Sequence, residues 1–184
     1  CLDRLADRLG LESGATVAIQ GYGNAARVFA RRAAASGYRI IAVGDSAGAT
    51  LDRDGLDVEA LAEHKDDAGS VAGFAGDLDP DDLLRLDCDL LVPAALGGVI
   101  DAAVAGELRC RAILEIANGP VNPDADAVLA ERGIEVVPDI LANAGGVIVS
   151  YHEWVQGKTG DYWPAEAVRE RLEAKSYLHK GLKI

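Results

Sequence analysis

The stretch TVAIQGYGNAARVFARRAAASGYRIIAVGD, residues 16–45, decides the fold. It begins with an apolar, β-branched run that ends at glycines, which predicts a buried strand. A helical pattern over 24–37 ends at Gly37, and a second apolar run follows over 38–45. A strand, a glycine turn, a helix and a strand within about 30 residues form a βαβ unit.

The turn inside this unit carries the pattern G-x-G-x-x-G/A, here GYGNAA at 21–26. Gly21 permits a tight turn, Gly23 lets the backbone approach a pyrophosphate, and Ala26 allows the helix to pack closely on the strand. The helix N-terminus then attracts the phosphate charge. Because the pattern lies between a predicted strand and a predicted helix, it favours dinucleotide binding over a purely structural glycine turn.

Asp45 ends the second strand, about 20 residues after the glycine turn, where a carboxylate can bond a ribose hydroxyl. That contact favours NAD, because a carboxylate repels the 2′-phosphate of NADP. A base such as Arg53 folded over the same spot would reverse the preference, and Asp45 is equally well explained as a capping or turn residue of GDSAG, 44–48. The expected cofactor is therefore NAD or NADP, with the choice open.

The rest of the chain alternates short apolar strands with helices, which predicts a Rossmann-like, doubly wound α/β fold with a mostly parallel sheet and helices on both faces. Predicted strands lie at 88–93, 112–117 and 134–138, and predicted helices at 56–65 (with Asp57 as N-cap), 79–87, 99–108, 122–133 and 164–174. Residues 143–154 predict the start of a buried helix. Residues 1–174 are expected to form one dinucleotide-binding domain with a lead-in helix at 1–13, followed by an atypical, lysine-rich tail at 175–184.

Polar or glycine-rich loops follow three predicted strands, at 93–100, 117–126 and 138–146. The carboxyl ends of parallel strands face the ligand crevice of an open sheet, so these loops are expected to converge there. Asn118 and Asn143 each offer an amide that donates and accepts, which suits a carboxamide, a ribose or an amino acid. Ordinary turn chemistry explains both residues equally well.

The composition narrows the function classes. A formal net charge of −12 opposes binding to nucleic acid. The sequence shows no secretory leader and no apolar run of about 20 residues, so we expect no membrane association and a cytoplasmic location. The cysteines and histidines lack metal-ligand spacing, so no metal is expected. The chain has no methionine and starts at Cys1, which leads us to expect a fragment of a longer protein.

Taken together, these stretches resemble the NAD(P)-binding domain of the glutamate/leucine/phenylalanine/valine dehydrogenase family. The resemblance runs from about residue 14 to 174, through VAIQGYGNAA, GLDVEAL, LDCDLLVPAAL, IANGP, ERGIEVVPDILANAGGV and SYHEWVQ in that order. It implies reversible NAD(P)-dependent oxidative deamination of an L-amino acid to its 2-oxo acid and ammonia. It also implies a homo-oligomer, often a hexamer, when the protein is full length.

Within the family, VSYHEWVQ at 149–156 looks like the glutamate branch, whose substrates are L-glutamate, 2-oxoglutarate and ammonia. The alternatives are a branched-chain or aromatic amino acid dehydrogenase and a stand-alone, non-catalytic NAD(P)-binding module. The resemblance implies that Val147 and Ser150 line the pocket for the substrate's side-chain carboxylate, and that Asn143 faces the nicotinamide or the substrate. The expected cofactor contacts are Gly21, Gly23, Asn24, Ala26, Asp45, Ser46, Ala94, Ala95, Asn118 and Asn143.

The chain departs from the family pattern at a few positions. Gly97 and Gly98 stand where the family usually has Glu-Asn, and Ile116 stands where it commonly has glycine. The family's catalytic lysine and aspartate lie in a preceding substrate domain, and its GGGK motif is absent from this sequence. We therefore expect no catalytic residue here, and a chain that by itself binds nucleotide without turning over glutamate.

Overall fold

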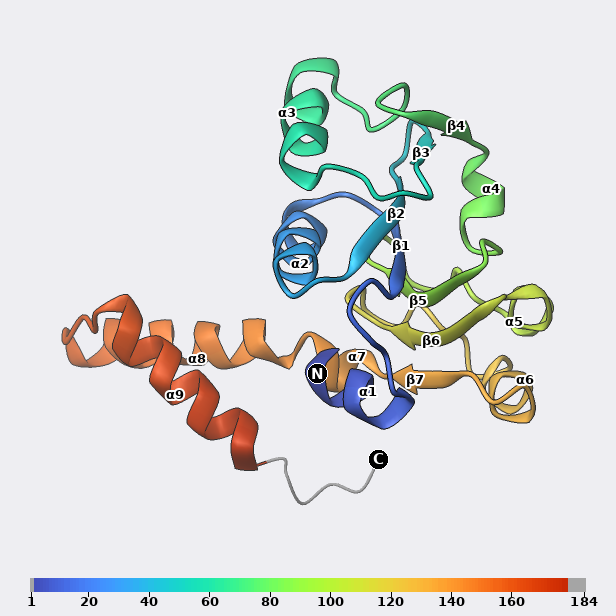
Figure 1. The fold of residues 1–184 in the computed structure, drawn as a ribbon. Coiled ribbons are helices and arrows are strands. Elements are labelled where there is room, and N and C mark those ends of the chain that lie inside the picture. Colours follow the sequence, from blue (N-terminus) through green and yellow to red (C-terminus); the bar gives the residue numbers. More distant parts are fainter. Residues whose placement is uncertain (1, 179–184) are drawn as a thin grey trace. The chain divides into compact units, whose positions relative to one another are not determined.

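The computed structural model describes residues 2–178, apart from the side chains of residues 3, 4 and 173–178. It contains two compact units, Cys1–Ala142 and Asn143–Ile184. The first is a sheet covered by helices, and the second contains two helices (Figure 1). Of the predicted tail at 175–184, residues 175–178 belong to the last helix and 179–184 lie outside the described residues.

The first unit is built on a seven-stranded sheet in the order β4-β3-β2-β1-β5-β6-β7. The strands are β1 (Thr16–Gln20), β2 (Arg39–Gly44), β3 (Ala49–Leu51), β4 (Gly76–Leu78), β5 (Cys88–Pro93), β6 (Cys110–Leu114) and β7 (Glu135–Val137). Strands β2, β1, β5, β6 and β7 are neighbours in that order and run parallel. At the β2 edge, β3 pairs antiparallel with β2, and β4 pairs antiparallel with β3. The strand order reverses between β1 and β5, which is where doubly wound sheets bind ligands.

Helices cover both faces of this sheet (Figure 1). One face carries α1 (Leu2–Leu9), α2 (Asn24–Ala35) and α3 (Val58–Ala68), and the other carries α4 (Pro80–Leu83), α5 (Ala102–Glu107) and α6 (Asp126–Glu131). A short helix, α7 (Asp139–Ala142), follows β7. This arrangement confirms the predicted Rossmann-like, mostly parallel α/β fold.

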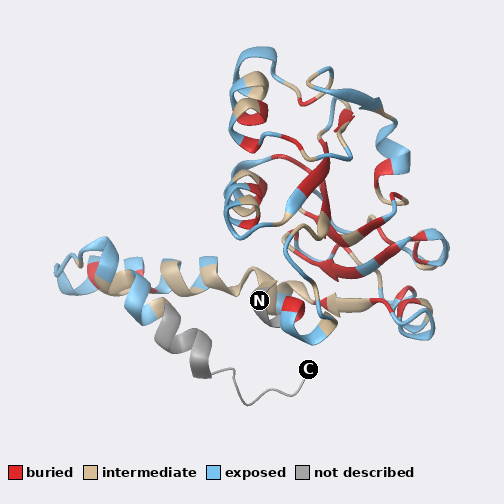
Figure 2. Cartoon of the chain, viewed as in Figure 1, coloured by how far each residue is buried: buried red, intermediate tan, exposed pale blue. Residues whose placement is uncertain are grey.

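The central strands are buried on both faces, and Figure 2 shows the buried residues concentrated along them. Val17 and Ile19 pack into the cluster beneath α1, α2 and α3, whereas Ala18 between them packs into the cluster beneath α4, α5 and α6. Leu90 and Leu91 of β5 divide in the same way. A strand covered on both sides has no polar face, which is why the sequence shows unbroken apolar runs.

Side-chain caps fix where several helices begin. The Asp57 carboxylate accepts hydrogen bonds from the backbone at the start of α3, as predicted, and Gly69 ends that helix in the left-handed region. Asp79 caps α4 in the same way. However, α4 ends at Leu83 and does not extend over the predicted 79–87, because the next N–H groups bond three residues back.

The sequence-based prediction missed β3 and β4, and it placed β6 slightly too late. Cys110 pairs with Cys88, so β6 begins before the predicted residue 112. It ends at Leu114 because the chain then turns, and the N–H groups of Ile116 and Ala117 both donate to the Pro93 carbonyl. The missed strands are only three residues long each, too short for a periodic pattern.

The second unit consists of α8 (Ala144–Thr159) and α9 (Ala165–Leu178). Trp163 N donates to the side-chain oxygen of Gln156 at 2.6 Å, which ties the segment before α9 to α8. The predicted buried start of α8 is wrong, because Val147 is 73% and Trp154 60% exposed in the described structure. None of the helices within the described residues has the length and apolar composition that a membrane span requires.

Leu90 provides a test of the core. It is fully buried in β5 between β1 and β6. We expect Leu90→Ala to lower the free energy of unfolding in urea by about 3 kcal/mol, because it leaves a cavity beneath the sheet. The matched variant Leu96→Ala truncates an exposed leucine and should change stability by about 0.5 kcal/mol or less. Equal losses for the two variants would contradict this description of the core.

Candidate functional site

The loops after the parallel strands lie at the carboxyl edge of the sheet, and two of them approach closely at Gly21. Gly21 follows β1 with φ +99°, in the region that favours glycine. A Cβ at this position would lie 2.6 Å from the Cβ of Ala95 and 2.8 Å from its N. Glycine therefore allows the loop after β5, with Ala94 and Ala95, to approach the turn after β1.

Gly23 has a different environment from Gly21. It is the N-cap of α2, its φ is −82°, and a Cβ there would meet nothing within 4 Å. No side chain caps α2, and its first turn has no acidic residue. Asn24 is exposed at the first helical position, and Ala26 is buried against the sheet as predicted. An exposed, uncapped helix N-terminus of this kind suits a phosphate group.

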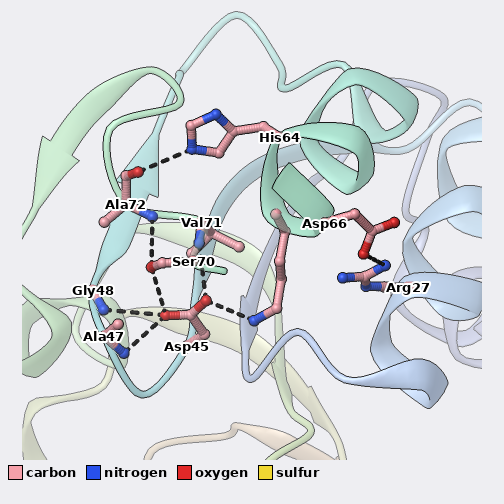
Figure 3. A network of polar contacts seen from close by, with 10 residues as sticks. Arg27, Asp45, Ala47, Gly48, His64, Asp66, Ser70, Val71 and Ala72 are labelled. Atoms are coloured by element: carbon pink, nitrogen blue, oxygen red, sulfur yellow. Dashed lines mark hydrogen bonds and ion pairs between the residues drawn. The ribbon is translucent and has the colours of Figure 1, made fainter. Parts of the chain in front are cut away.

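Asp45 is held in a dense network at the end of β2 (Figure 3). Its side chain is only 6% exposed. Both carboxylate oxygens accept hydrogen bonds, at 2.6–3.2 Å, from donors on two segments of the chain. The donors are the backbone N–H groups of Ala47, Gly48 and Val71, the hydroxyl of Ser70 and the ammonium of Lys65.

These contacts control the ionisation of Asp45. Burial raises the pKa of its carboxyl, but the hydrogen bonds from Lys65, Ala47, Val71 and Ser70 outweigh burial and lower the pKa to about 2. A carboxylate offers about four acceptor sites, so five donors leave none open for a ribose hydroxyl. Of the two predicted roles, the geometry favours the turn residue over the ribose contact.

The other predicted contacts in the first unit lie on the loops at this edge. Ser46 is exposed in the turn after β2, and Ala95 and Asn118 are exposed after β5 and β6. Ala94 is partly buried, and its N–H donates to the carbonyl of Gln20 at the end of β1. The structure thus brings these residues to one edge, where the predicted crevice was expected.

The remaining predicted contacts belong to the second unit. Asn143 immediately precedes α8, with φ −104°, and makes no capping hydrogen bond through its side chain. Val147 and Ser150 are both exposed, and their spacing of three residues puts them on one face of α8. Gly145 and Gly146, expected in a loop, lie in the first turn of this helix.

The sequence-based prediction missed the residues that donate hydrogen bonds to Asp45. Lys65 and Ser70 lie 20 and 25 residues beyond Asp45, so no local pattern links them to it. The only available signal was that Lys65 is one of very few lysines in an acidic chain. Within the described part of the chain, no group of three or more His, Cys, Asp or Glu side chains is arranged to hold a metal ion.

A sequence profile of the Glutamate/Leucine/Phenylalanine/Valine dehydrogenase family matches residues 1–180. The chain belongs to this family. The match includes the glycine turn, the loops after β5, β6 and β7, and α8, so the structural features described above are those of a dehydrogenase-family chain.

Named members of the dehydrogenase family are similar in sequence and structure. NADP-specific glutamate dehydrogenase A1 of Halobacterium salinarum is 52% identical over 165 residues, which cover 88% of this chain and 40% of the relative. The hetero-hexameric glutamate dehydrogenase of Thermus thermophilus, in a Leu-bound form, is 38% identical with a TM-score of 0.88 over 96% of this chain and 42% of that one. Glutamate dehydrogenase from Peptoniphilus asaccharolyticus is 34% identical with a TM-score of 0.74, over 96% and 41%. The chain thus spans about two fifths of the length of these relatives.

The structure accommodates the departures from the dehydrogenase family pattern. Ile116, where the family commonly has glycine, does not adopt positive φ, so its backbone does not require glycine. Gly98 adopts a positive φ of +69°, in the region that favours glycine. A Cβ on Gly97 would lie 2.8 Å from the carbonyl oxygen of Asn118, so glycine lets two edge loops approach closely.

Acid unfolding tests the Asp45 network. A carboxyl whose pKa is lowered in the folded state stabilises the protein above its unfolded pKa, and loses that effect as pH falls through the folded value. For Asp45 the window runs from its ordinary 3.8 down to about 2. We expect Asp45→Asn to lower the free energy of unfolding at pH 7 by roughly 2 kcal/mol, with the difference from the wild type shrinking across that window.

Urea titrations at several pH values measure this difference. The control is Asp87→Asn, which replaces an exposed carboxylate. A difference between wild type and Asp45→Asn that stays constant from pH 5 to pH 2, or that grows on acidification, would contradict the assigned pKa direction.

Proposed function

We propose that this chain is the dinucleotide-binding part of a glutamate dehydrogenase, which interconverts L-glutamate with 2-oxoglutarate and ammonia using NAD or NADP. The observation that carries the proposal is the glycine turn at 21–26, which lies at the switch point of the sheet with an open Gly23 and an uncapped α2. The 52% identity to a protein named glutamate dehydrogenase supports the substrate. Residues 1–174 form this part in the proposal.

The residues present fit a dinucleotide. The exposed N-terminus of α2, with Gly23 and Asn24, receives the pyrophosphate, because, apart from its neighbours in the chain, no atom of the described residues lies within 4 Å of where a Cβ on Gly23 would stand. Ser46 borders the adenosine half beyond β2, and Asn118 borders the nicotinamide half beyond β6. When bound, the nicotinamide ring accepts or supplies the hydride. In the proposal, Asn143 faces the nicotinamide or the substrate.

We propose NADP as the preferred cofactor. Asp45 has no open acceptor for a ribose hydroxyl, and its charge is neutralised by Lys65 at 2.6 Å. An ammonium has three donors, so Lys65 retains hydrogen-bonding capacity for a 2′-phosphate, and the exposed Ser46 hydroxyl adds a donor nearby. The 52% identical relative is named NADP-specific, in agreement with this choice.

In the proposal, Val147 and Ser150 bind the side-chain carboxylate of glutamate. Both are exposed on one face of α8, so their side chains are open to a ligand. The catalytic lysine and aspartate belong to a substrate domain outside these residues, so this chain by itself is inactive. The complete enzyme is a cytoplasmic homo-oligomer in the proposal. The Thermus thermophilus relative is named a hetero-hexamer, which supports an oligomeric assembly but not identical subunits.

Gly23→Ala tests the nucleotide site. The new methyl group occupies open space at an ordinary φ, so the protein should fold with unchanged thermal stability. It stands where the pyrophosphate approaches the backbone, and we expect NADPH to bind about tenfold more weakly or worse in a fluorescence titration. Gly106→Ala, another glycine with open space around it, is the control and should bind as the wild type does. Unchanged NADPH affinity in Gly23→Ala would refute the proposed site.

Lys65→Ala tests the choice of cofactor. Removing the ammonium should reduce the ratio of NADPH to NADH affinity by about tenfold, because only NADPH carries the 2′-phosphate. Using the ratio corrects for any loosening of the Asp45 network, which affects both nucleotides. Lys65→Arg should keep most of the preference, and Lys158→Ala in the second unit should keep all of it. Equal losses for NADPH and NADH in Lys65→Ala would argue against Lys65 as the phosphate contact.

A further inference from the structure

We infer that Glu115 and Asp139 are positioning residues, which hold the Asn118 loop where the nicotinamide half of the cofactor binds. The inference rests on the proposed function and extends it to residues that need not touch the cofactor. The two carboxylates form a chain of hydrogen bonds that starts at the buried Glu115, directly after β6, and ends on the backbone beside Asn118.

Glu115 is the buried end of this chain. It directly follows β6, and it is only 5% exposed. Its own N–H donates to the carbonyl of Val137, and its carboxylate accepts the N–H of Asp139 at 2.8 Å. Burial, with the nearby negative charge of Asp139, raises the pKa of this carboxyl and outweighs the backbone hydrogen bonds from Asp139 and Val121 that lower it. Glu115 thus fixes where the chain continues after β7.

Asp139 passes this constraint to the neighbouring loop. It is the first residue of α7, and one of its carboxylate oxygens accepts the N–H of Gly119 at 2.8 Å. The other oxygen accepts the N–H of Ile140, which holds the carboxylate in one orientation. The bond to Gly119 connects segments 20 residues apart in the sequence and fixes the backbone directly after Asn118.

The opposite side of the Asn118 loop is also fixed. Gly98 N donates to the carbonyl of Gly119 at 2.8 Å, and position 97 lies so close to the Asn118 carbonyl that only glycine avoids a clash. The loop therefore lies between the β5 loop on one side and Asp139 on the other. Without the Asp139 carboxylate, the N–H of Gly119 beside Asn118 loses its acceptor, whereas the backbone of Val121 further along the loop keeps its bond to Glu115.

The order of the strands indicates which half of the cofactor lies beside the Asn118 loop. The dinucleotide crosses the sheet at the switch point between β1 and β5, with its adenosine half over β1 and β2. The loops after β5, β6 and β7 therefore border the nicotinamide half. Loss of the Asp139 contact should affect binding of the nicotinamide half and leave the adenosine half intact.

The experiment compares two probes on the full 184-residue chain, NADPH and adenosine 2′,5′-bisphosphate, which lacks the nicotinamide half. In Asp139→Ala we expect NADPH affinity to fall about tenfold and the emission change of bound NADPH to be lost, with affinity for the bisphosphate unchanged. Asp139→Asn and Glu115→Gln keep an oxygen that accepts the same N–H and should retain most NADPH binding. Asp79→Ala, which removes a similar carboxylate bond at the start of α4, is the control and should match the wild type.

Each outcome separates the inference from the proposed function. If Asp139→Ala binds NADPH as the wild type does, or loses affinity for both probes equally, the inference is overturned and the proposed function stands. If Asp139→Asn is as impaired as Asp139→Ala, the hydrogen bond to Gly119 is not the cause, and the inference is overturned as well. A wild-type chain that binds neither probe overturns the proposed function, and the inference with it.

Discussion

The close approach of the turn after β1 to the loop after β5 is the constraint on which the site depends. A Cβ at position 21 would lie 2.6 Å from the Cβ of Ala95, so this turn accepts only glycine without rearrangement. The two strands are neighbours at the switch point, and the turn held by this contact leads directly into α2. Gly23 then leaves the N-terminus of α2 open at the carboxyl edge of the sheet.

Two carboxylates organise the loops on either side of this point, and they are stabilised in different ways. Asp45 accepts donors from two segments and is neutralised by Lys65, so its pKa is lowered. Glu115 is buried with backbone donors alone, and its pKa is raised. In a chain with a net charge of −12, these residues act as local anchors for backbone N–H groups. The net charge of the chain does not show which of its carboxylates have this role.

Family membership and the contacts within the chain account for different features of the site. Membership of the dehydrogenase family accounts for the order of the motifs, and the contacts explain why the motifs need particular residues. Gly97 is an example. It differs from the usual family residue at this position, and a Cβ there would lie only 2.8 Å from the Asn118 carbonyl oxygen. The substitution therefore has a steric consequence in this chain that the family pattern does not reveal.

The sequence by itself determined the βαβ unit, the parallel core of the sheet, the glycine turn and the Asp57 cap. These features depend on side-chain periodicity and on backbone preferences within a few residues, which a single sequence displays. Tertiary structure decided the antiparallel strands β3 and β4, the partners of Asp45, and the bond from Asp139 to Gly119. The bonds from Lys65 to Asp45 and from Gly119 to Asp139, and the pairing of β4 with β3, join groups 20 or more residues apart, which become neighbours only when the sheet assembles. The pairing of β3 with β2 is local, but a strand of three residues is too short to show a periodic pattern.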